Sequence, residues 1–397
     1  MNRSVTRQGT HFLGALGVGL TLGVSLALSA CGGAAADTPK AAAAPAPVAS
    51  AVPLKEGGSR LQNGSIAYVM THKFWAVYET PAKDGKTVEC PTGMNDGPRE
   101  QFRMLYGDGK GPKKYTVVEA QLKREGDLWH PSTTPEPPQL KFKEAQGKVS
   151  YGMNLDGKIG PNDFESPDGV KGVDNQLYRA IGCIGNYRTM GTIYHFEDLF
   201  MNSYNDARIV VELTHVKSLE NSADVTVNIY RGSDRMLADS TGEGYLPGGT
   251  QHVDLRWGKQ FVSHTKGQIV AGVLTTDPID RAELPWGSTF GTHAYHVFRG
   301  LRLQLKLTDG TAKGMLAGYV DTDAFIHHLN TSWSTHHHSY GQLSSQSLYR
   351  ELVSLADGYP DAKTGRNTAI SSAANVEFVQ VYLVKPNETK QLTASNK

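Results

Sequence analysis

A histidine-rich segment in the last quarter of the chain contains the residue types that bind transition metals. Its candidate ligands are the side chains of Asp321, Asp323, His327, His336 and His338. Imidazole and carboxylate groups together suit zinc, copper or iron. Adjacent residues of a strand point to opposite faces, so only alternate histidines such as His336 and His338 could reach one ion. The segment predicts a transition-metal site; the alternative is a polar loop in which the imidazoles hydrogen-bond to neighbouring hydroxyl groups.

A second group of candidate ligands consists of oxygen-bearing side chains in an Asp- and Gly-rich stretch. These are Asn154, Asp156, Asp163, Glu165, Asp168 and Asp174. Calcium prefers six to eight hard oxygens on a flexible loop. The order of Asn154, Asp156, Gly157 and Asp163 resembles an EF-hand calcium loop, which implies calcium ligands at these positions. Gly152 stands where that loop has its first Asp, and simple turn formation by Asp and Gly is the alternative.

The common catalytic motifs are missing from the sequence. It contains no HExxH zinc motif, no GxSxG nucleophile motif and no Walker A phosphate loop. We therefore expect a binding protein rather than an enzyme. A metal-dependent enzyme that uses the histidine-rich segment between 327 and 338 is the alternative hypothesis.

The first thirty residues have the pattern of an export signal. Arg3 and Arg7 precede a run of apolar and small residues from 12 to 30, and the first acidic residue is Asp37. A membrane-spanning helix is the competing interpretation, because about 20 apolar residues cross a bilayer. Four glycines interrupt the run, which favours a signal peptide over residues 1–30.

The end of this run resembles the lipobox of bacterial lipoproteins, in the order Leu28, Ser29, Ala30, Cys31. The resemblance implies cleavage before Cys31, a diacylglycerol group on its sulfur, and a further acyl chain on the new amino terminus, with palmitate among the attached fatty acids. In this family, glycine rather than aspartate at position 32 implies that the protein is sorted to the outer membrane. Each buried CH₂ of an acyl chain contributes about 0.8 kcal/mol, so several chains anchor a protein to a membrane without a spanning helix. We therefore expect a lipid-anchored protein of the bacterial cell envelope.

The segment 31–59 that follows is rich in Ala, Pro and Gly and poor in large apolar residues, so we expect a flexible tether. The chain has 40 basic and 39 acidic residues, in no long runs of one sign. This balance does not favour nucleic acid as a partner.

Two cysteines remain beyond the lipobox, Cys90 and Cys183. An even pair in an exported protein predicts a disulfide, because the periplasm is oxidising. Two buried, unpaired thiols are the alternative.

The rest of the chain predicts a mainly β fold, an antiparallel sandwich or jelly roll with a few short helices. The region 60–208 combines strand patterns with Asp/Gly loops and short helical stretches, and the region 209–397 contains regularly spaced strands. Leucines at 301, 303, 305 and 307 alternate with polar residues, as in a strand with one buried face. One amphipathic helix is expected near 344–357.

Five tryptophans and seventeen tyrosines could line a carbohydrate-binding face, although packing in the core is the alternative use of these residues. The sequence therefore predicts a lipid-anchored module, stabilised by calcium, that binds a carbohydrate ligand or another envelope protein.

Replacement of Cys31 by Ser tests the anchor. The Ser hydroxyl is not a substrate for thioether formation, so we expect the variant to incorporate no labelled palmitate and to leave the membrane fraction. Metabolic labelling and fractionation measure both properties, and unchanged acylation of C31S would contradict the lipobox interpretation.

Overall fold

A computed structural model describes residues 59–95, 123–125, 128–130, 142–189, 191–203, 208–242, 244–286, 295–331 and 345–386. The predicted signal peptide, Cys31 and nearly all of the predicted tether lie outside the described residues. The described residues all belong to one compact unit, Gly57–Lys397. None of the helices described in this unit is long and apolar enough to cross a bilayer.

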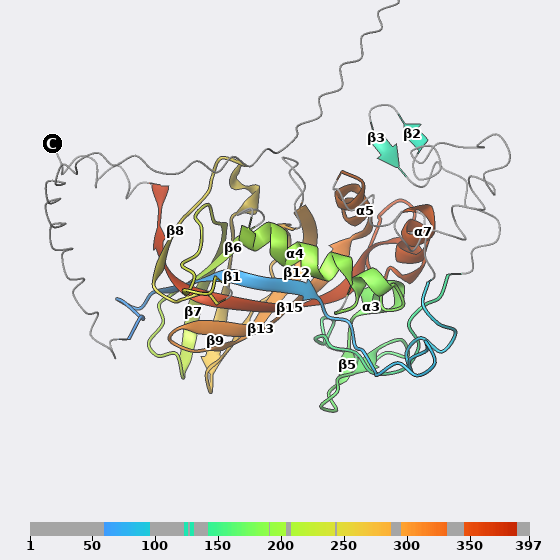
Figure 1. Cartoon of the computed structure of the whole chain (residues 1–397), viewed down its shortest axis with the longest axis horizontal. Helices are drawn as coiled ribbons and strands as arrows, with labels where there is room; N and C mark the ends of the chain where they lie inside the picture. The colour runs from blue at the N-terminus through green and yellow to red at the C-terminus, as the bar shows by residue number, and fades with distance from the viewer. Residues whose placement is uncertain are drawn as a thin grey trace, which may run out of the picture. The chain divides into compact units, whose positions relative to one another are not determined.

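Eight antiparallel strands form a closed, barrel-like sheet (Figure 1). In order around the ring they are β1 (Ile66–Trp75), β6 (Ile209–Thr214), β7 (Ser222–Arg231), β9 (Ser263–Val270), β10 (Val273–Thr276), β12 (Tyr295–Leu307), β13 (Thr311–Asp321) and β15 (Asn367–Val384). The ring closes where β15 pairs with β1, with Ala67 opposite Val381 and Trp75 opposite Ala374. Strands from both predicted regions thus share one sheet.

Three shorter strands pair with strands of this ring: β8 (Gly249–His252) and β14 (Gly358–Pro360) pair with β15, and β11 (Ala282–Pro285) pairs with β12. Two separate two-stranded sheets consist of β2 (Lys123–Glu125) with β3 (Leu128–His130) and of β4 (Phe164–Glu165) with β5 (Lys171–Val173). The mainly β, antiparallel prediction is confirmed. The finer prediction of a sandwich or jelly roll does not describe this sheet. Alternation of apolar and polar residues indicates that one face of a strand is buried. The pattern is the same in a sandwich and in a closed ring, so it does not distinguish these two architectures.

Strand β12 shows how the sequence pattern becomes the barrel wall. Leu301, Leu303, Leu305 and Leu307 are buried, whereas the polar residues between them are half-buried or exposed. The same alternation in β7 buries Val225, Val227 and Ile229 in the same core. Apolar side chains from around the ring therefore fill its interior, and burial of this surface is the main favourable contribution to folding.

The α-helices are α3 (Gln176–Ile181), α4 (Thr192–Ser203), α5 (Thr322–Thr331) and α7 (Ser345–Leu355), and two 3₁₀ helices span Gly185–Tyr187 and Lys259–Phe261. The helix predicted near 344–357 is confirmed as α7, which buries Leu348 and Leu352. Helix α5 contacts β12 and β13, while α3 and α7 contact β15 and each other. These helices gather at one end of the barrel (Figure 1), which we call the helix-covered end.

Helix α4 lies along β1 and is joined to it by an ion pair and by a hydrogen bond between side chains. Lys73 Nζ lies 2.9 Å from Glu197 Oε2, and His72 Nδ1 lies 2.6 Å from Asp198 Oδ2. Lys73 has no exposed side-chain surface. A buried ammonium group is costly unless it is paired, so the Lys73 contact fixes the position of α4 on the barrel wall.

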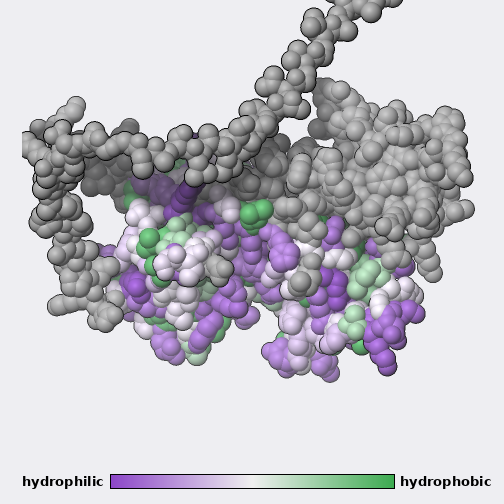
Figure 2. All heavy atoms as spheres, in the orientation of Figure 1, coloured by the Kyte–Doolittle hydropathy of each residue, from purple (hydrophilic) through white to green (hydrophobic). Residues whose placement is uncertain are grey.

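The opposite end of the barrel is where the described chain begins. Ser59 Oγ and the Arg60 amide both donate to Asp309 Oδ1, at 3.1 and 2.7 Å, in the turn between β12 and β13. The last residues of β15 lie at this end as well. We call it the tether end. On the face drawn in Figure 2, hydrophilic and hydrophobic residues are interspersed over the described surface.

The predicted disulfide is confirmed, because Cys90 and Cys183 are bonded to each other. Both residues are buried beside Phe164 and Tyr178, and the bond joins the segment after β1 to the end of α3. Glu89, next to Cys90, lies 2.6 Å from Arg188. Burial opposes ionisation of Glu89, but hydrogen bonds from Thr80 and Arg188 outweigh it and lower its pKa to about 2.

Replacement of both disulfide cysteines by Ala should destabilise the protein. The bond closes a loop with a sequence separation of 93 residues, for which the chain-entropy relation gives roughly 4–5 kcal/mol. We expect a decrease of about 2–5 kcal/mol in the free energy of unfolding, measured by urea denaturation. The matched control is C31S, which removes a cysteine outside the bond. Equal stability of the double variant and the control would show that the bond contributes nothing.

Candidate functional site

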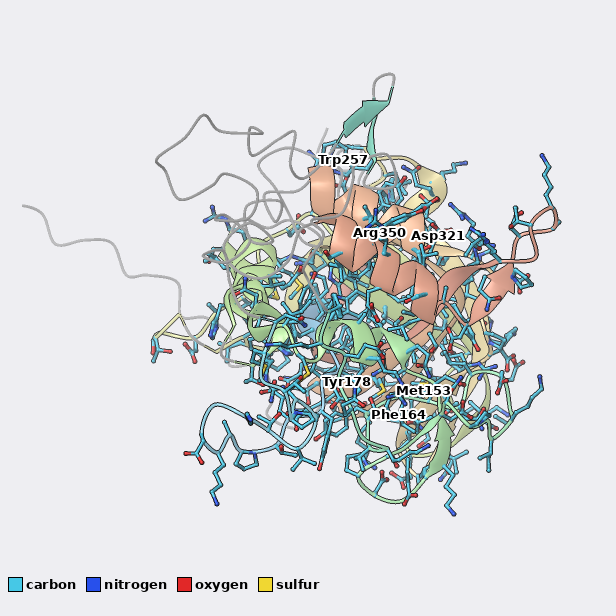
Figure 3. All side chains as sticks on the ribbon, turned by 90° about the vertical axis from the view of Figure 1, so that its right-hand side faces the viewer. Met153, Phe164, Tyr178, Trp257, Asp321 and Arg350 are labelled. Atoms are coloured by element: carbon cyan, nitrogen blue, oxygen red, sulfur yellow. A yellow bond between two sulfur atoms is a disulfide. The ribbon has the colours of Figure 1, made fainter. Side chains whose placement is uncertain are left out.

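A polar pocket of about 510 Å³ lies at the helix-covered end. We call it the Asp321 pocket. The side chains that give it its chemical character are those of Arg299, Asp321, Asp323, Tyr349, Tyr359 and Arg366. They come from β12, β13, α5, α7, β14 and the turn before β15, so the closed sheet and its helices must all be in place for the pocket to exist. Figure 3 looks onto this end, with Asp321 and Arg350 beside the helices.

Asp321 is the last residue of β13 and is held by both of its carboxylate oxygens. Oδ1 accepts a hydrogen bond of 2.9 Å from the Ala324 amide, which caps the amino terminus of α5. Oδ2 accepts a bond of 3.2 Å from Arg299 Nη2. The carboxylate is therefore fixed in orientation on one wall of the pocket.

Arg299 and Tyr359 form a second contact in the wall. The Arg299 guanidinium carbon lies 5.3 Å from the centre of the Tyr359 ring, a cation–π distance. Tyr359 has a φ of 56°, in the left-handed region that residues with a side chain seldom adopt. The centres of the Tyr359 and Tyr319 rings lie 5.4 Å apart in an edge-to-face arrangement. The Arg299 guanidinium and the Tyr319 ring thus hold Tyr359 at the pocket while 37% of it stays exposed.

Tyr349 on α7 faces Asp323 in the first turn of α5. Burial and then the Asp323 carboxylate raise the pKa of Tyr349 to about 12. The phenol consequently stays protonated at neutral pH and acts as a hydrogen-bond donor in the pocket wall.

Two of the five residues predicted to bind a transition metal line this pocket, namely Asp321 and Asp323. His327 lies in α5, but its side chain lies outside the described residues, as do His336 and His338. Within the described part of the chain, no three His, Cys, Asp or Glu side chains are arranged to hold a metal ion. The transition-metal site stays a prediction.

The predicted calcium loop is held by hydrogen bonds within itself. Asn154 Oδ1 accepts from the Gly157 amide at 2.6 Å, and Asp156 Oδ1 accepts from the Lys158 amide at 2.8 Å. Asp163 Oδ2 accepts from the Gly160 amide. These contacts are those of a tight turn, in which Gly157 has a φ of 77°.

The other three predicted calcium ligands are in different surroundings. Asp174 is buried and accepts from the amide of Leu155 at 2.6 Å and from that of Asp156 at 3.3 Å. Burial raises the pKa of Asp174 to about 6, with smaller contributions from the charges of Asp163 and Asp156. Glu165 is exposed on β4, and Asp168 accepts from Ser166 Oγ at 2.5 Å. The fold thus brings Asp156, Asp163 and Asp174 into electrostatic contact, and calcium binding itself stays a prediction.

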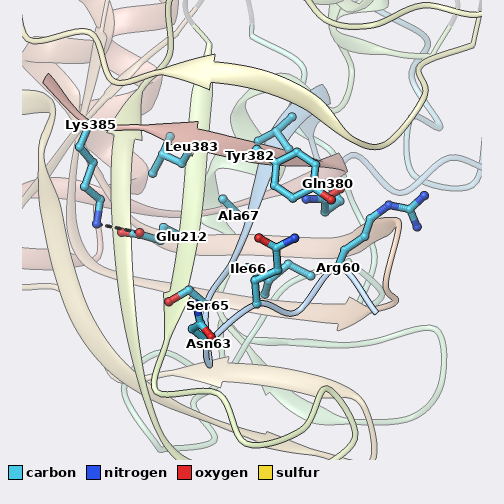
Figure 4. A pocket seen from close by; sticks show the side chains of 12 residues that line it. Arg60, Asn63, Ser65, Ile66, Ala67, Glu212, Gln380, Tyr382, Leu383 and Lys385 are labelled. Carbon is cyan, nitrogen blue, oxygen red and sulfur yellow. Dashed lines mark ion pairs between the residues drawn. The ribbon is translucent and has the colours of Figure 1, made fainter. Parts of the chain in front are cut away.

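A second polar pocket, of about 440 Å³, lies at the tether end (Figure 4). Glu212 on its wall is paired with Lys385 Nζ at 2.8 Å and accepts hydrogen bonds from Asn228 and Tyr230. Gln380 is only 1% exposed, and no described residue donates a hydrogen bond to its Oε1. We call this the Gln380 pocket.

Sequence reasoning missed most residues of both pockets. Arg299, Tyr349 and Tyr359 carry no motif and are brought together only by the topology. The sequence did contain one signal for the second pocket. Val376, Phe378 and Gln380 are alternate residues of β15, and the side chains of Val376 and Phe378 face the core. A polar residue at such a position requires a partner or a solvent-filled site.

No protein-family model, curated protein or solved structure matches this chain.

The buried Asp174 predicts a specific dependence of stability on pH. Its pKa of about 6 in the folded state exceeds the value of roughly 3.9 for an unfolded chain, so the folded state binds more protons between about pH 4 and pH 6. The contribution of Asp174 to the free energy of unfolding is therefore largest below pH 4 and is lost as the pH rises to 6. Relative to the wild type, D174N should lack this decrease in urea denaturation at successive pH values.

The exposed Asp168 provides the matched control. The variant D168N removes an exposed carboxylate from the same loop region and leaves the buried carboxylate of Asp174 in place. Identical pH profiles for the wild type and D174N would contradict a raised pKa at Asp174.

Calcium binding at Asp174 and the other predicted ligands gives a separate prediction. Bound calcium would favour the ionised form of Asp174, so addition of Ca²⁺ at pH 7 should raise the Tm of the wild type and leave that of D174N unchanged. A wild-type Tm that does not respond to millimolar Ca²⁺ would rule out stabilisation by calcium in this loop.

Proposed function

We propose that this protein is a lipid-anchored component of the bacterial envelope that binds a carbohydrate ligand in the Asp321 pocket. The observation that carries the proposal is the composition of that pocket. Carboxylate, guanidinium and phenol groups surround a space of about 510 Å³. This space is within the usual size of small-molecule sites.

The polar groups of the pocket suit a ligand with many hydroxyl groups. Asp323 accepts hydrogen bonds, and Arg366 donates them; Thr368 and Asn367 do both. Sugar hydroxyls both donate and accept, so a ring with several hydroxyls can satisfy such a mixed set. The Tyr359 ring adds an apolar face of the kind that packs against the C–H groups of a sugar.

Contacts within the protein hold the side chains in the wall of the pocket. Asp321 is fixed by Ala324 and Arg299, and Tyr359 is fixed by Arg299 and Tyr319. A preorganised site loses less conformational entropy on binding, which favours recognition of a specific ligand. This arrangement supports binding as the role of the pocket.

The place of the protein in the envelope follows from the amino-terminal pattern. The lipobox order that ends at Cys31 supports lipidation and an outer-membrane location, and the segment 31–59 supplies a tether. The tether joins the folded unit at Ser59, at the barrel end opposite the Asp321 pocket. This separation supports a pocket that faces away from the membrane.

A metal-dependent enzyme is the alternative, and one observation favours it: Asp323 and Asp321 line a pocket beside α5, which also carries His327. Metal analysis of the purified mature protein separates the two functions. A stoichiometric transition metal that is lost in a variant with His336 and His338 replaced by Ala would favour the enzyme.

Replacement of Asp321 by Asn tests the carbohydrate site. Asn is also a good helix cap, so D321N should preserve α5 while it loses the charge that pairs with Arg299. We expect at least a tenfold loss of affinity, about 1.4 kcal/mol, for the envelope glycan that binds the wild type. Isothermal titration calorimetry with peptidoglycan fragments and outer-membrane polysaccharide measures the affinities of D321N and the wild type.

The matched control is D224N, an exposed position on β7 far from the pocket in the strand order. Absence of binding to every glycan by the wild type, or equal affinity of D321N and the wild type, would contradict the proposed site.

A further inference from the structure

The charged side chains of the Asp321 pocket differ in how far the protein itself engages them. They are those of Arg299, Asp321, Asp323, Asp361 and Arg366. Arg299 and Asp321 pair with each other. The Asp323 carboxylate takes part in a hydrogen bond with the Tyr349 hydroxyl. The remaining two belong to the hairpin of residues 358–369, which joins β14 to β15 and which we call the pocket hairpin.

Asp361 is engaged by the turn of the pocket hairpin. Its Oδ1 accepts from the amides of Lys363 and Thr364 at 3.1 and 2.8 Å and from the Thr364 hydroxyl at 2.9 Å. The hydrogen bonds from Thr364, above all from its amide, hold the pKa of Asp361 below its ordinary value. The ionised carboxylate therefore stabilises the turn, as is common for Asp.

Arg366 is the charged group of the pocket that stays uncommitted. Within the part of the chain that the structure describes, its guanidinium has no hydrogen bond, ion pair or ring contact. Its backbone is held, because the Asp361 amide donates to the Arg366 carbonyl at 2.8 Å and the Arg366 amide donates to Thr364 Oγ1 at 3.3 Å. A guanidinium presents a planar fork of N–H donors that matches a carboxylate or a phosphate.

Tyr359 adds a second donor from the other strand of the pocket hairpin. Pro360 pairs with Asn367, and Thr368 Oγ1 donates to the Tyr359 carbonyl at 2.8 Å. Tyr359 and Arg366 are therefore diagonal neighbours across the hairpin, a separation of roughly 7–8 Å that long side chains can bridge. Among the described residues, none forms a hydrogen bond with the Tyr359 hydroxyl.

An irregularity in β12 provides the space for this hydroxyl. The register between β12 and β13 shifts between Arg299 and Arg302, and Gly300 in this bulge has a φ of 61°. A side-chain carbon at Gly300 would lie 3.0 Å from the Tyr359 hydroxyl oxygen. Bulges are frequent beside functional sites, and so are strained backbones such as that of Tyr359. Two unusual backbone conformations thus meet where an uncommitted donor is held.

The two walls of the pocket consequently offer different chemistry. On the helix wall, Asp323 accepts hydrogen bonds, and the positive end of α5 offsets part of its charge. On the hairpin wall, Arg366 and Tyr359 offer a cation and a neutral donor. A ligand that meets both walls has a negatively charged group at one position and hydroxyl groups at others.

We propose that the Asp321 pocket recognises an acidic sugar, whose carboxylate or phosphate ester binds Arg366 and the Tyr359 hydroxyl while its ring hydroxyls bind Asp323. The inference rests on the proposed function of this pocket as a glycan site. It adds the chemical class of the ligand and its orientation between the two walls.

The test compares native and chemically neutralised glycans on the full mature protein. The probes are peptidoglycan fragments and outer-membrane polysaccharide, each untreated, with its carboxylates reduced to alcohols, or with its phosphate esters removed by hydrofluoric acid. In titration calorimetry, one of the two treatments should lower the affinity of the wild type about tenfold, as expected for one charged hydrogen-bonded contact. The treatment that does so identifies the acidic group.

The outcomes separate this inference from the proposed function. A wild type that binds no untreated glycan would overturn the glycan site and the acidic ligand together. Equal affinity for the untreated glycan and for both treated forms would leave the glycan site in place and overturn the acidic ligand alone.

Replacement of Arg366 by Gln locates the acidic group. R366Q should bind the untreated glycan about tenfold more weakly than the wild type and show no further loss with the treated glycan. The matched control is K363Q, which removes the same charge from an exposed position of the same turn that does not line the pocket, and it should behave as the wild type. Full affinity of R366Q, or an equal loss in K363Q, would overturn the assignment.

Replacement of Tyr359 by Phe tests the second donor. Y359F keeps the ring and removes only the hydroxyl, so affinity for the untreated glycan should fall about threefold and affinity for the treated glycan should stay unchanged. Equal affinity of Y359F and the wild type for the untreated glycan would overturn the role of the hydroxyl.

Discussion

The pairing of β15 with β1 is the interaction on which the rest of the structure depends. β15 is 18 residues long, and it pairs with β13 over most of its first part and with β1 from Ala374 to Val381. This second pairing joins the last strand of the ring to the first. Without it the sheet would expose two edges with unpaired amide and carbonyl groups, which is unfavourable in water and invites aggregation.

Closure also creates the two ends of the molecule. Because neighbouring strands are antiparallel, the end of β13 and the start of β15 meet at one end, where Asp321 pairs with Ala369. The start of β13 and the end of β15 meet at the other, where Asp309 holds Arg60. An 11-residue strand such as β13 separates the two ends by roughly 35 Å. The two polar pockets therefore lie at opposite ends of the barrel, one beside the helices and one beside the tether.

Local features of the fold were predictable because their signals are local. Alternating leucines identify β12, a Ser followed by spaced leucines identifies α7, and two cysteines in an exported chain identify the disulfide. The ring was not predictable from such signals. Ala67 and Val381 are 314 positions apart, and a strand pattern reports which face is buried but not which strand lies alongside.

The same distinction applies to the pockets. Asp321 and Asp323 stood out in the sequence as carboxylates near histidines, and they do line a pocket. The sequence also places Asp321 directly before a helix, and its role as a cap could have been recognised from that position. Arg299 and Tyr359 could not have been recognised from the sequence as residues of this pocket. They are brought to Asp321 only by the pairing of β12, β13, β14 and β15. For the calcium loop, the pattern of Asp and Asn was sufficient to predict a turn, whereas the burial of Asp174 depends on the whole fold.

Photo-crosslinking in intact envelopes tests most directly the claim that the Asp321 pocket binds a glycan. A photoreactive amino acid at Arg366, which is exposed at the rim of the pocket, would be compared with one at the exposed Asp224 at the other end of the barrel. We predict a carbohydrate adduct from position 366 and none from position 224. The same adducts from both positions, or no carbohydrate adduct from position 366, would contradict the account.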